Sequence, residues 1–122
     1  MIQGIDLGDI LLDCPDAEAL CDFYAQLLGW EKCLLYGLPG VRGRGLIFLF
    51  AQEEDYIRPV WPEAAAQQQK QMHRDFVVDD LPEAVCQAEA LGAVLAGSQF
   101  GGDAFVTLLD PAGHPFCLCA KE

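Results

Sequence analysis

The sequence predicts an α+β domain made of two similar halves. A strand, an acidic turn, an amphipathic helix and a closing glycine follow one another in Leu11–Trp30, and a weaker echo of this order recurs in Asp75–Ala93. The closing glycines, Gly29 and Gly92, lie 63 residues apart, about half of the 122-residue chain. Such self-similarity indicates two copies of one structural unit, and the length suits a single domain, residues 1–122.

The first helix is predicted to begin after Asp16, which has the right chemistry for an N-cap. Glu18 falls in the first turn, where the helix dipole favours acidic side chains. Gly29 is placed to end the helix in the left-handed conformation. Helical spacing gives the segment between them one apolar stripe, made of Leu20, Phe23, Tyr24, Leu27 and Leu28.

The second helix carries its own boundary signals. Asp80 and Glu83 have the spacing of a capping box. Pro82 falls in the first turn, where a missing N–H group costs little. We expect Gly92 to end the helix, and its inward face to consist of Val85, Ala88 and Leu91.

Apolar segments predict strands in both halves. In the first half these are Ile10–Asp13, Glu31–Tyr36 and Leu46–Phe50; in the second they are His73–Val78, Val94–Ser98, Ala104–Leu109 and Pro115–Ala120. The glycine-rich stretch 37–45 predicts at most a short or irregular strand. Asp110-Pro111-Ala112-Gly113 is a turn sequence that should join the last two strands as a hairpin.

A connecting segment is expected between the halves. We place the first module at about 8–52, the linker at 53–70 and the second module at about 71–120. The linker's two prolines, at 59 and 62, could stiffen it enough to hold Trp61 over a cavity. Alternatively, the segment crosses the surface with Trp61 packed down on it.

Charge limits the classes of partner. The formal net charge of −12 disfavours nucleic acid and anionic membranes. It favours a cationic small ligand, or it is simply a solvated acidic surface. No apolar run approaches the roughly 20 residues of a membrane span. The N-terminus shows no secretory signal, so we expect a cytoplasmic protein.

The six cysteines contain no CxxC pair, which argues against a zinc knuckle or a thioredoxin-type motif. In a reducing compartment they are expected to be free thiols that serve as small core side chains. Cys117 and Cys119 share one strand face by the two-residue period. That pair could form a dry apolar wall or a thiol site.

Three segments carry a resemblance to a known family. They are LDCPDAEALCDFYAQLLGWE, HRDFVVDDLPEAV and LLDPAGHPFCL, the last being the most specific. The chain resembles, from about Gly8 to Leu118, the glyoxalase-like domain proteins of the glyoxalase / bleomycin-resistance / extradiol-dioxygenase (vicinal oxygen chelate) superfamily. The resemblance implies two βαβββ-type modules whose mixed and antiparallel sheets curl into a cleft, with helices outside. It also implies that dimers are common and that the cleft holds a divalent metal or a bulky organic molecule.

The resemblance further implies positions for metal ligands. His73 matches a histidine ligand of the family; Asp9 stands where histidine is more usual, and Cys117 where glutamate is usual. The matching strand of the first module, Leu46–Phe50, offers no ligand. A set of Asp9, His73 and Cys117 would favour zinc, because thiolate is a soft ligand. The other interpretations are that His73 is a hydrogen-bonded inward histidine and Cys117 a core residue.

Three functions remain open at this point. The one we favour is a homodimer that binds a small organic ligand, cationic or aromatic, in its cleft and lacks a complete catalytic metal site. The residues predicted to contact the ligand are Phe48, Phe50, Trp61, His73, Phe105 and Cys117, although the phenylalanines could equally be core. The alternative is a divalent-metal-dependent lyase, isomerase or dioxygenase, for which no catalytic residue is assigned. The third is a non-catalytic partner domain.

Overall fold

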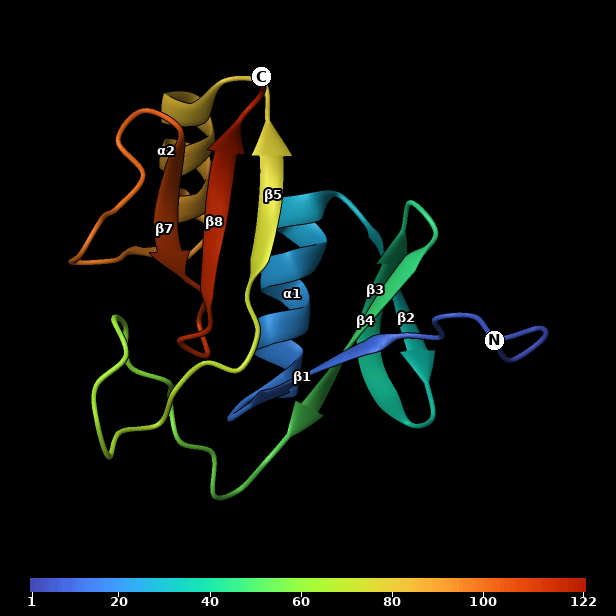
Figure 1. Ribbon diagram of the computed structural model, residues 1–122. Coiled ribbons are helices and arrows are strands. Elements are labelled where there is room, and N and C mark those ends of the chain that lie inside the picture. The colour runs from blue at the N-terminus through green and yellow to red at the C-terminus, as the bar shows by residue number, and fades with distance from the viewer. The chain divides into compact units, whose positions relative to one another are not determined.

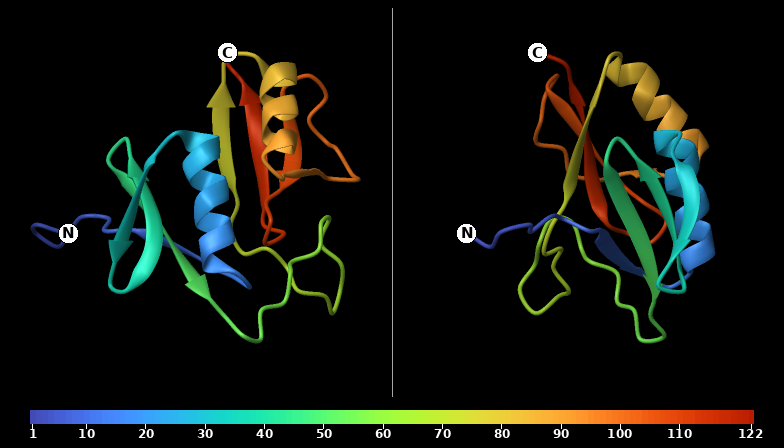
Figure 2. Two further views of the ribbon diagram at one scale, coloured as in Figure 1. Left: turned by 180° about the vertical axis from the view of Figure 1, so that it is seen from behind. Right: turned by 90° about the vertical axis from the view of Figure 1, so that its right-hand side faces the viewer.

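The computed structural model describes residues 1–122 and divides the chain into two units, residues 1–54 and 55–122. The boundary falls within the predicted connecting segment 53–70. Each unit consists of one helix and one four-stranded sheet (Figure 1). The two views in Figure 2 show that each helix lies along one face of its own sheet.

The first unit follows a β-α-β-β-β order. Its elements are β1 (Ile10–Cys14), α1 (Ala17–Leu28), β2 (Glu31–Leu35), β3 (Leu38–Gly43) and β4 (Leu46–Gln52). The strand order in the sheet is β1-β4-β3-β2. β1 pairs with β4 in parallel, and the other two pairings are antiparallel.

The second unit repeats this plan. Its elements are β5 (Arg74–Val78), α2 (Leu81–Ala90), β6 (Val94–Leu95), β7 (Phe105–Leu109) and β8 (Pro115–Ala120). The order is β5-β8-β7-β6, again with the first and last strands parallel. The predicted α+β class and the internal repeat are therefore confirmed.

Both helices begin where the sequence indicates, and α1 also ends there; α2 ends at Ala90 with Leu91 as its C-cap, one residue earlier than the predicted end at Gly92. The Asp16 carboxylate accepts a hydrogen bond from the Ala19 N–H (3.1 Å), and Gly29 ends α1 with φ of 67°. The Asp80 carboxylate caps α2 in the same way, accepting from the Glu83 N–H at 3.1 Å. Each cap satisfies an N–H group that has no partner inside the helix.

The core of the first unit is built around one aromatic side chain of α1. Tyr24 is fully buried; its ring stacks on Phe50 at 5.7 Å and meets Phe48 edge-on at 6.1 Å. In the second unit, Phe116 and Leu108 are fully buried on the helix side of the sheet. Burying a large apolar side chain contributes about 1.5–3 kcal/mol, so these residues fix each helix on its sheet.

The glycine-rich stretch forms a regular strand, so the prediction of a short or irregular one was wrong. β3 has six residues and pairs on both sides. Its glycines give space to neighbouring side chains. A Cβ atom on Gly43 would lie 2.6 Å from the Trp30 ring, and one on Gly40 would lie 2.6 Å from Leu49 Cδ2. Here glycine marks close packing within a strand rather than a turn.

The end of the second unit's sheet also differs from expectation. β6 was expected over Val94–Ser98 but has only two residues. Beyond it, the Gln99 side chain takes the place of a strand: its Oε1 accepts from the Thr107 N–H (2.9 Å), and its Nε2 donates to the Thr107 carbonyl (2.8 Å). The predicted hairpin between β7 and β8 is present, with Gly113 N–H donating to the Asp110 carbonyl at 2.8 Å.

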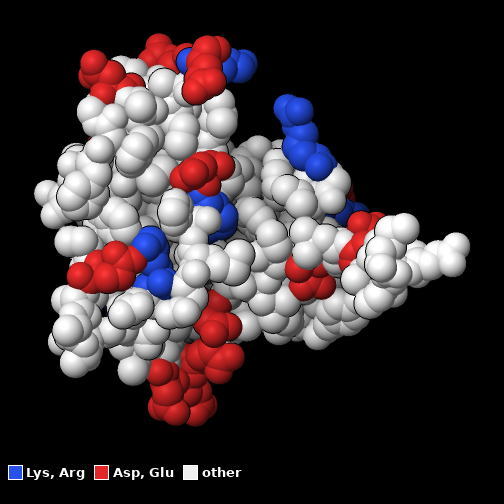
Figure 3. Space-filling view, viewed as in Figure 1, with Lys and Arg blue, Asp and Glu red and all other residues white.

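Acidic side chains outnumber basic ones on the face seen in Figure 3, in keeping with the net charge of −12. Neither helix is long and apolar enough to cross a membrane.

The close packing at Gly40 gives a stability prediction. Gly40→Ala would place a Cβ 2.5 Å from the Phe48 carbonyl oxygen, which is backbone and cannot rotate away. We expect the free energy of unfolding to fall by about 1–3 kcal/mol, the usual effect of overpacking. The control is Gly8→Ala, where nothing lies within 4 Å of the new Cβ. Urea denaturation of both variants checks this; equal stabilities would contradict it.

Candidate functional site

The two faces of the second unit's sheet differ in chemistry. Side chains alternate between faces along each strand. Phe76, Val106 and Phe116 lie on the face that α2 covers. The opposite face, which we call the polar face, bears His73, Asp75, Thr107, Cys117 and Cys119.

Strand register brings three of these polar-face side chains together. Asp75 of β5 is paired with Cys117 of β8, and Cys117 is paired with Thr107 of β7. Directly paired residues on one face have Cβ atoms roughly 4.5–5.5 Å apart. The Thr107 Oγ1 and Cys117 Sγ atoms lie 3.3 Å apart, within hydrogen-bond distance for sulfur. The row therefore joins a carboxylate, a thiol and a hydroxyl across three strands.

His73 extends this row just before β5. Its Nε2 lies 3.3 Å from Asp75 Oδ1, an ion pair whenever the imidazole is protonated. The imidazole, the Asp75 carboxylate and the Cys117 thiol each offer one donor atom, and these atoms all lie within 4.8 Å of one another. His73 and Asp75 are exposed, whereas Cys117 is only 6% exposed. The cluster thus has a buried sulfur and two groups open to solvent.

Burial raises the pKa of the Cys117 thiol, and the nearby Asp75 carboxylate raises it further. The Thr107 hydrogen bond and the Lys70 charge act in the opposite direction but are outweighed. The pKa of Cys119 is also raised, first by burial and then by the charge of Asp75. Both thiols are therefore held in the neutral form at neutral pH, unlike the thiolate of a nucleophilic cysteine.

The connecting segment supplies a basic and an aromatic side chain to the same unit. Lys70 is paired with Glu63, and its ammonium lies 4.9 Å from the centre of the Trp61 ring. The Trp61 indole N–H donates to the Ser98 carbonyl at 3.2 Å, and its ring meets Phe100 edge-on. These contacts tie the segment to the loop that precedes β7.

The donor set can be compared with what zinc requires. With zinc–ligand distances of about 2.0–2.3 Å, the donors of a tetrahedral site lie roughly 3.3–3.8 Å apart. The present limit of 4.8 Å is wider by about one ångström, a change within reach of side-chain rotation at the two exposed residues. An imidazole, a carboxylate and a thiol are all donors that zinc accepts. The residues therefore fit a three-ligand site, provided that Cys117 loses its proton.

The structure brings two of the three predicted metal ligands together, His73 and Cys117. The third, Asp9, lies in the first unit, half-buried just ahead of β1. Asp75 was not predicted. The signal for it was available, since Asp75 follows His73 by two residues in an expected strand and so shares its face.

The predicted aromatic contacts have different positions. Phe48 and Phe50 are buried against Tyr24 of α1, which fits the alternative that they belong to the core. Trp61 is half-buried on the loop at Ser98. Phe105 is half-buried at the start of β7, and its ring packs against Gly101, where a Cβ would come within 2.6 Å.

The raised thiol pKa values predict a pattern of alkylation. A thiol reacts as the thiolate, so we expect exposed Cys86 to react with iodoacetamide at pH 7.5 well before Cys117 and Cys21, whose pKa values are both raised by burial. The rate of Cys117 modification should keep rising with pH beyond the range in which the rate for an ordinary thiol levels off. Peptide mass spectrometry over time measures each site, and rapid labelling of Cys117 at pH 7.5 would contradict the assignment.

The sequence matches the pattern of one known protein family. The "Glyoxalase-like domain" family pattern matches residues 9–119. No curated protein sequence matches the chain.

Solved structures of the same fold include several with small-molecule chemistry in their names. A glyoxalase/bleomycin resistance protein/dioxygenase family enzyme from Burkholderia phytofirmans has 20% identity and a TM-score of 0.71, covering 95% of this chain and 98% of its own. A fosfomycin resistance protein from Listeria monocytogenes has 18% identity and a TM-score of 0.70, covering 100% and 94%. Lactoylglutathione lyase from Agrobacterium tumefaciens has 21% identity and a TM-score of 0.61, covering 98% and 96%.

At these identities the structures establish the fold alone, whereas the family match spans nearly the whole chain. The chain belongs to the glyoxalase-like domain family.

Proposed function

We propose that this glyoxalase-like domain binds a small organic molecule on the polar face of its second sheet. The observation that carries the proposal is the row of Asp75, Cys117 and Thr107, with His73 at its end. A buried thiol and hydroxyl form a floor with little charge, and an exposed carboxylate and imidazole stand beside it. Ligand sites combine such a floor with a few polar groups that fix orientation.

Charge supports a cationic ligand. The Asp75 carboxylate is the negative group of the cluster, while the ammonium of Lys70 is already paired with Glu63. The chain as a whole carries a formal net charge of −12. A long-range negative potential raises the local concentration of cations. Trp61 adds an aromatic ring that already makes a cation–π contact with the ammonium group of Lys70.

The names of the structural neighbours support the general class of ligand. One is a fosfomycin resistance protein and another a lactoylglutathione lyase. Both names refer to small organic molecules. We further propose, from the family resemblance, that the protein is a homodimer, and we propose the cytoplasm as its location. The net charge of −12 supports the absence of a nucleic-acid or anionic-membrane partner.

A second candidate function is that of a divalent-metal-dependent enzyme, which the cluster of three donors favours. His73, Asp75 and Cys117 would hold the ion, and zinc suits a thiolate ligand best. A bound ion would supply Lewis-acid polarisation of a substrate oxygen. The buried Thr107 hydroxyl would orient the sulfur of Cys117.

Ligand binding on the polar face can be tested through its own thiol. We expect a cationic aromatic compound that binds there to slow the alkylation of Cys117 while leaving that of Cys86 unchanged. Asp75→Asn should weaken binding by about three- to ten-fold, because it removes a charge-assisted contact. Asp55→Asn, which removes an exposed carboxylate of the connecting segment, should leave binding unchanged. A screened set in which no compound protects Cys117 would contradict the proposal.

The metal alternative has a separate test. If it holds, untagged protein should contain near-stoichiometric metal by elemental analysis, and His73→Ala should lose it. Asp75→Ala should weaken zinc rebinding by about 10-fold or more through the loss of one ligand, and Asp9→Ala tests the ligand that the family resemblance suggested. The Asp55→Ala variant is the matched control. Absence of metal, with no thermal shift on adding zinc, nickel, manganese or iron(II), would reject this function.

A further inference from the structure

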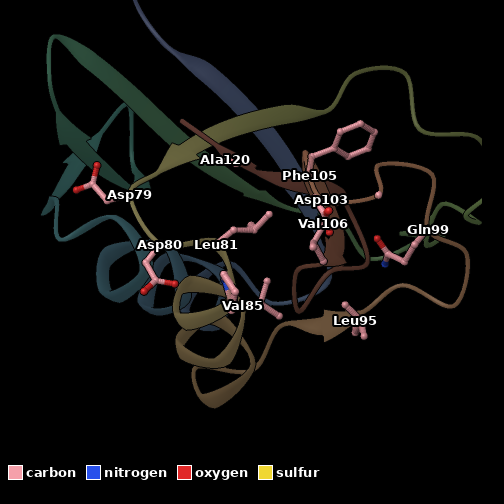
Figure 4. A pocket seen from close by; sticks show the side chains of 12 residues that line it. Asp79, Asp80, Leu81, Val85, Leu95, Gln99, Asp103, Phe105, Val106 and Ala120 are labelled. Atoms are coloured by element: carbon pink, nitrogen blue, oxygen red, sulfur yellow. The ribbon is translucent and has the colours of Figure 1, made fainter. Parts of the chain in front are cut away.

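The opposite face of the same sheet, which α2 covers, borders a pocket of about 780 Å³. The pocket opens between α2, the start of β7 and the loop that joins β6 to β7 (Figure 4). This volume falls within the range of small-molecule sites, roughly 300–1,000 Å³. All of its lining residues belong to the second unit. Most of its strand lining, namely Leu95, Val106 and Ala120, lies on the face that α2 covers, opposite Thr107 and Cys117. Phe105, at the edge of the pocket, is paired with Cys119.

The walls of the pocket are mainly apolar. In Figure 4 the side chains of Leu81 and Val85 from α2 converge with Leu95 and Val106 from the sheet. Leu95 is 46% exposed, so part of this apolar wall is open to water. A ligand with an apolar body would therefore gain from burying these groups.

The polar groups that line the pocket are acidic. Asp79, Asp80 and Asp103 contribute to the lining, and no lysine, arginine or histidine does. Asp79 is paired with Lys121 at 2.7 Å, and Asp80 is used as the cap of α2. Asp103, in the loop before β7, makes no ion pair. It is thus the carboxylate best able to receive a new positive charge.

The start of α2 at this pocket is unsuited to an anion. Free N–H groups at a helix N-terminus attract anions, but here the Glu83 N–H is already satisfied by the Asp80 carboxylate. The neighbouring carboxylates would repel a second negative group. We propose that the pocket is a binding site for an organic monocation with an apolar body, such as an aryl-alkyl amine, and that it is distinct from the site on the polar face.

Three probes that share the same phenylalkyl body and differ only in the charge of the polar group test this proposal. They are phenylbutylamine, phenylbutanol and phenylbutyrate. Titrations followed by ¹H–¹⁵N NMR spectra should show the amine perturbing amides of Val85, Leu95 and Gln99. We expect the amine to bind about three- to ten-fold more tightly than the alcohol, and the carboxylate to bind least. Equal affinities for amine and alcohol, or perturbations centred on His73 and Cys117, would overturn the proposal.

Two variants locate the interaction. Asp103→Asn should weaken binding of the amine by about two- to five-fold, the range of an exposed ion pair. Binding of the alcohol should be unchanged. Asp55→Asn is the control for the change in net charge. Leu95→Trp should fill the pocket and abolish binding of all three probes. Asp75→Asn should leave the amine's perturbation of Val85, Leu95 and Gln99 unchanged, which separates this site from the proposed function. An unchanged amine affinity in both pocket variants would rule the site out.

Discussion

The parallel pairing of the first and last strands of each unit is the constraint on which the rest of the structure depends. In the second unit, α2 carries the chain from the β5 edge of the sheet to the β6 edge, and β7 and β8 then fill the gap between them. The last strand therefore has neighbours on both sides, and its first four residues are buried. Cys117 lies at the centre of the sheet for this reason, with Asp75 on one side and Thr107 on the other. The same constraint puts β4 of the first unit between β1 and β3, which explains why Phe48 and Phe50 are core residues.

Local signals in the sequence were sufficient for most of this architecture. The caps at Asp16 and Asp80 and the turn that begins at Asp110 depend on a few neighbouring residues, so the sequence predicts them directly. The prediction for β3 was wrong because its glycines make room for residues distant in sequence, Leu49 and Trp30. Composition does not reveal such contacts. The short β6 has a similar cause, since the Gln99 side chain replaces the backbone pairing expected there.

The candidate site was predictable only in part. His73 and Cys117 were identified through the family resemblance, but their proximity comes from the register of β5 on β8. Asp75, two residues after His73, was not predicted because the family resemblance assigns no ligand to its position. The faces of the phenylalanines could not be assigned from an uninterrupted apolar strand, because alternation disappears when both faces are buried. Side-chain orientation in such strands becomes known only from the fold.

The two candidate functions of the polar face require different protonation states of the Cys117 thiol. Burial and the Asp75 charge keep the Cys117 thiol protonated, whereas a metal would need the thiolate. A bound metal ion would also neutralise the Asp75 charge that now opposes ionisation of the Cys117 thiol. The sulfur would then exchange its proton for a stronger interaction with the ion. Without a metal, the same neutral thiol beside Thr107 is a suitable floor for an organic ligand.

The two faces of the second sheet can act separately because the alternation of side chains isolates them. On one face Asp75 belongs to a row with a thiol and an imidazole; on the other, Asp103 stands near leucine and valine side chains without a basic partner. The first arrangement supplies directional donors and acceptors, and the second supplies apolar area with one available charge. A ligand selected by directional contacts would gain little from the second site. The strand residue that links them, Thr107, is held by Gln99 from the loop beside the pocket and by Cys117 on the polar face.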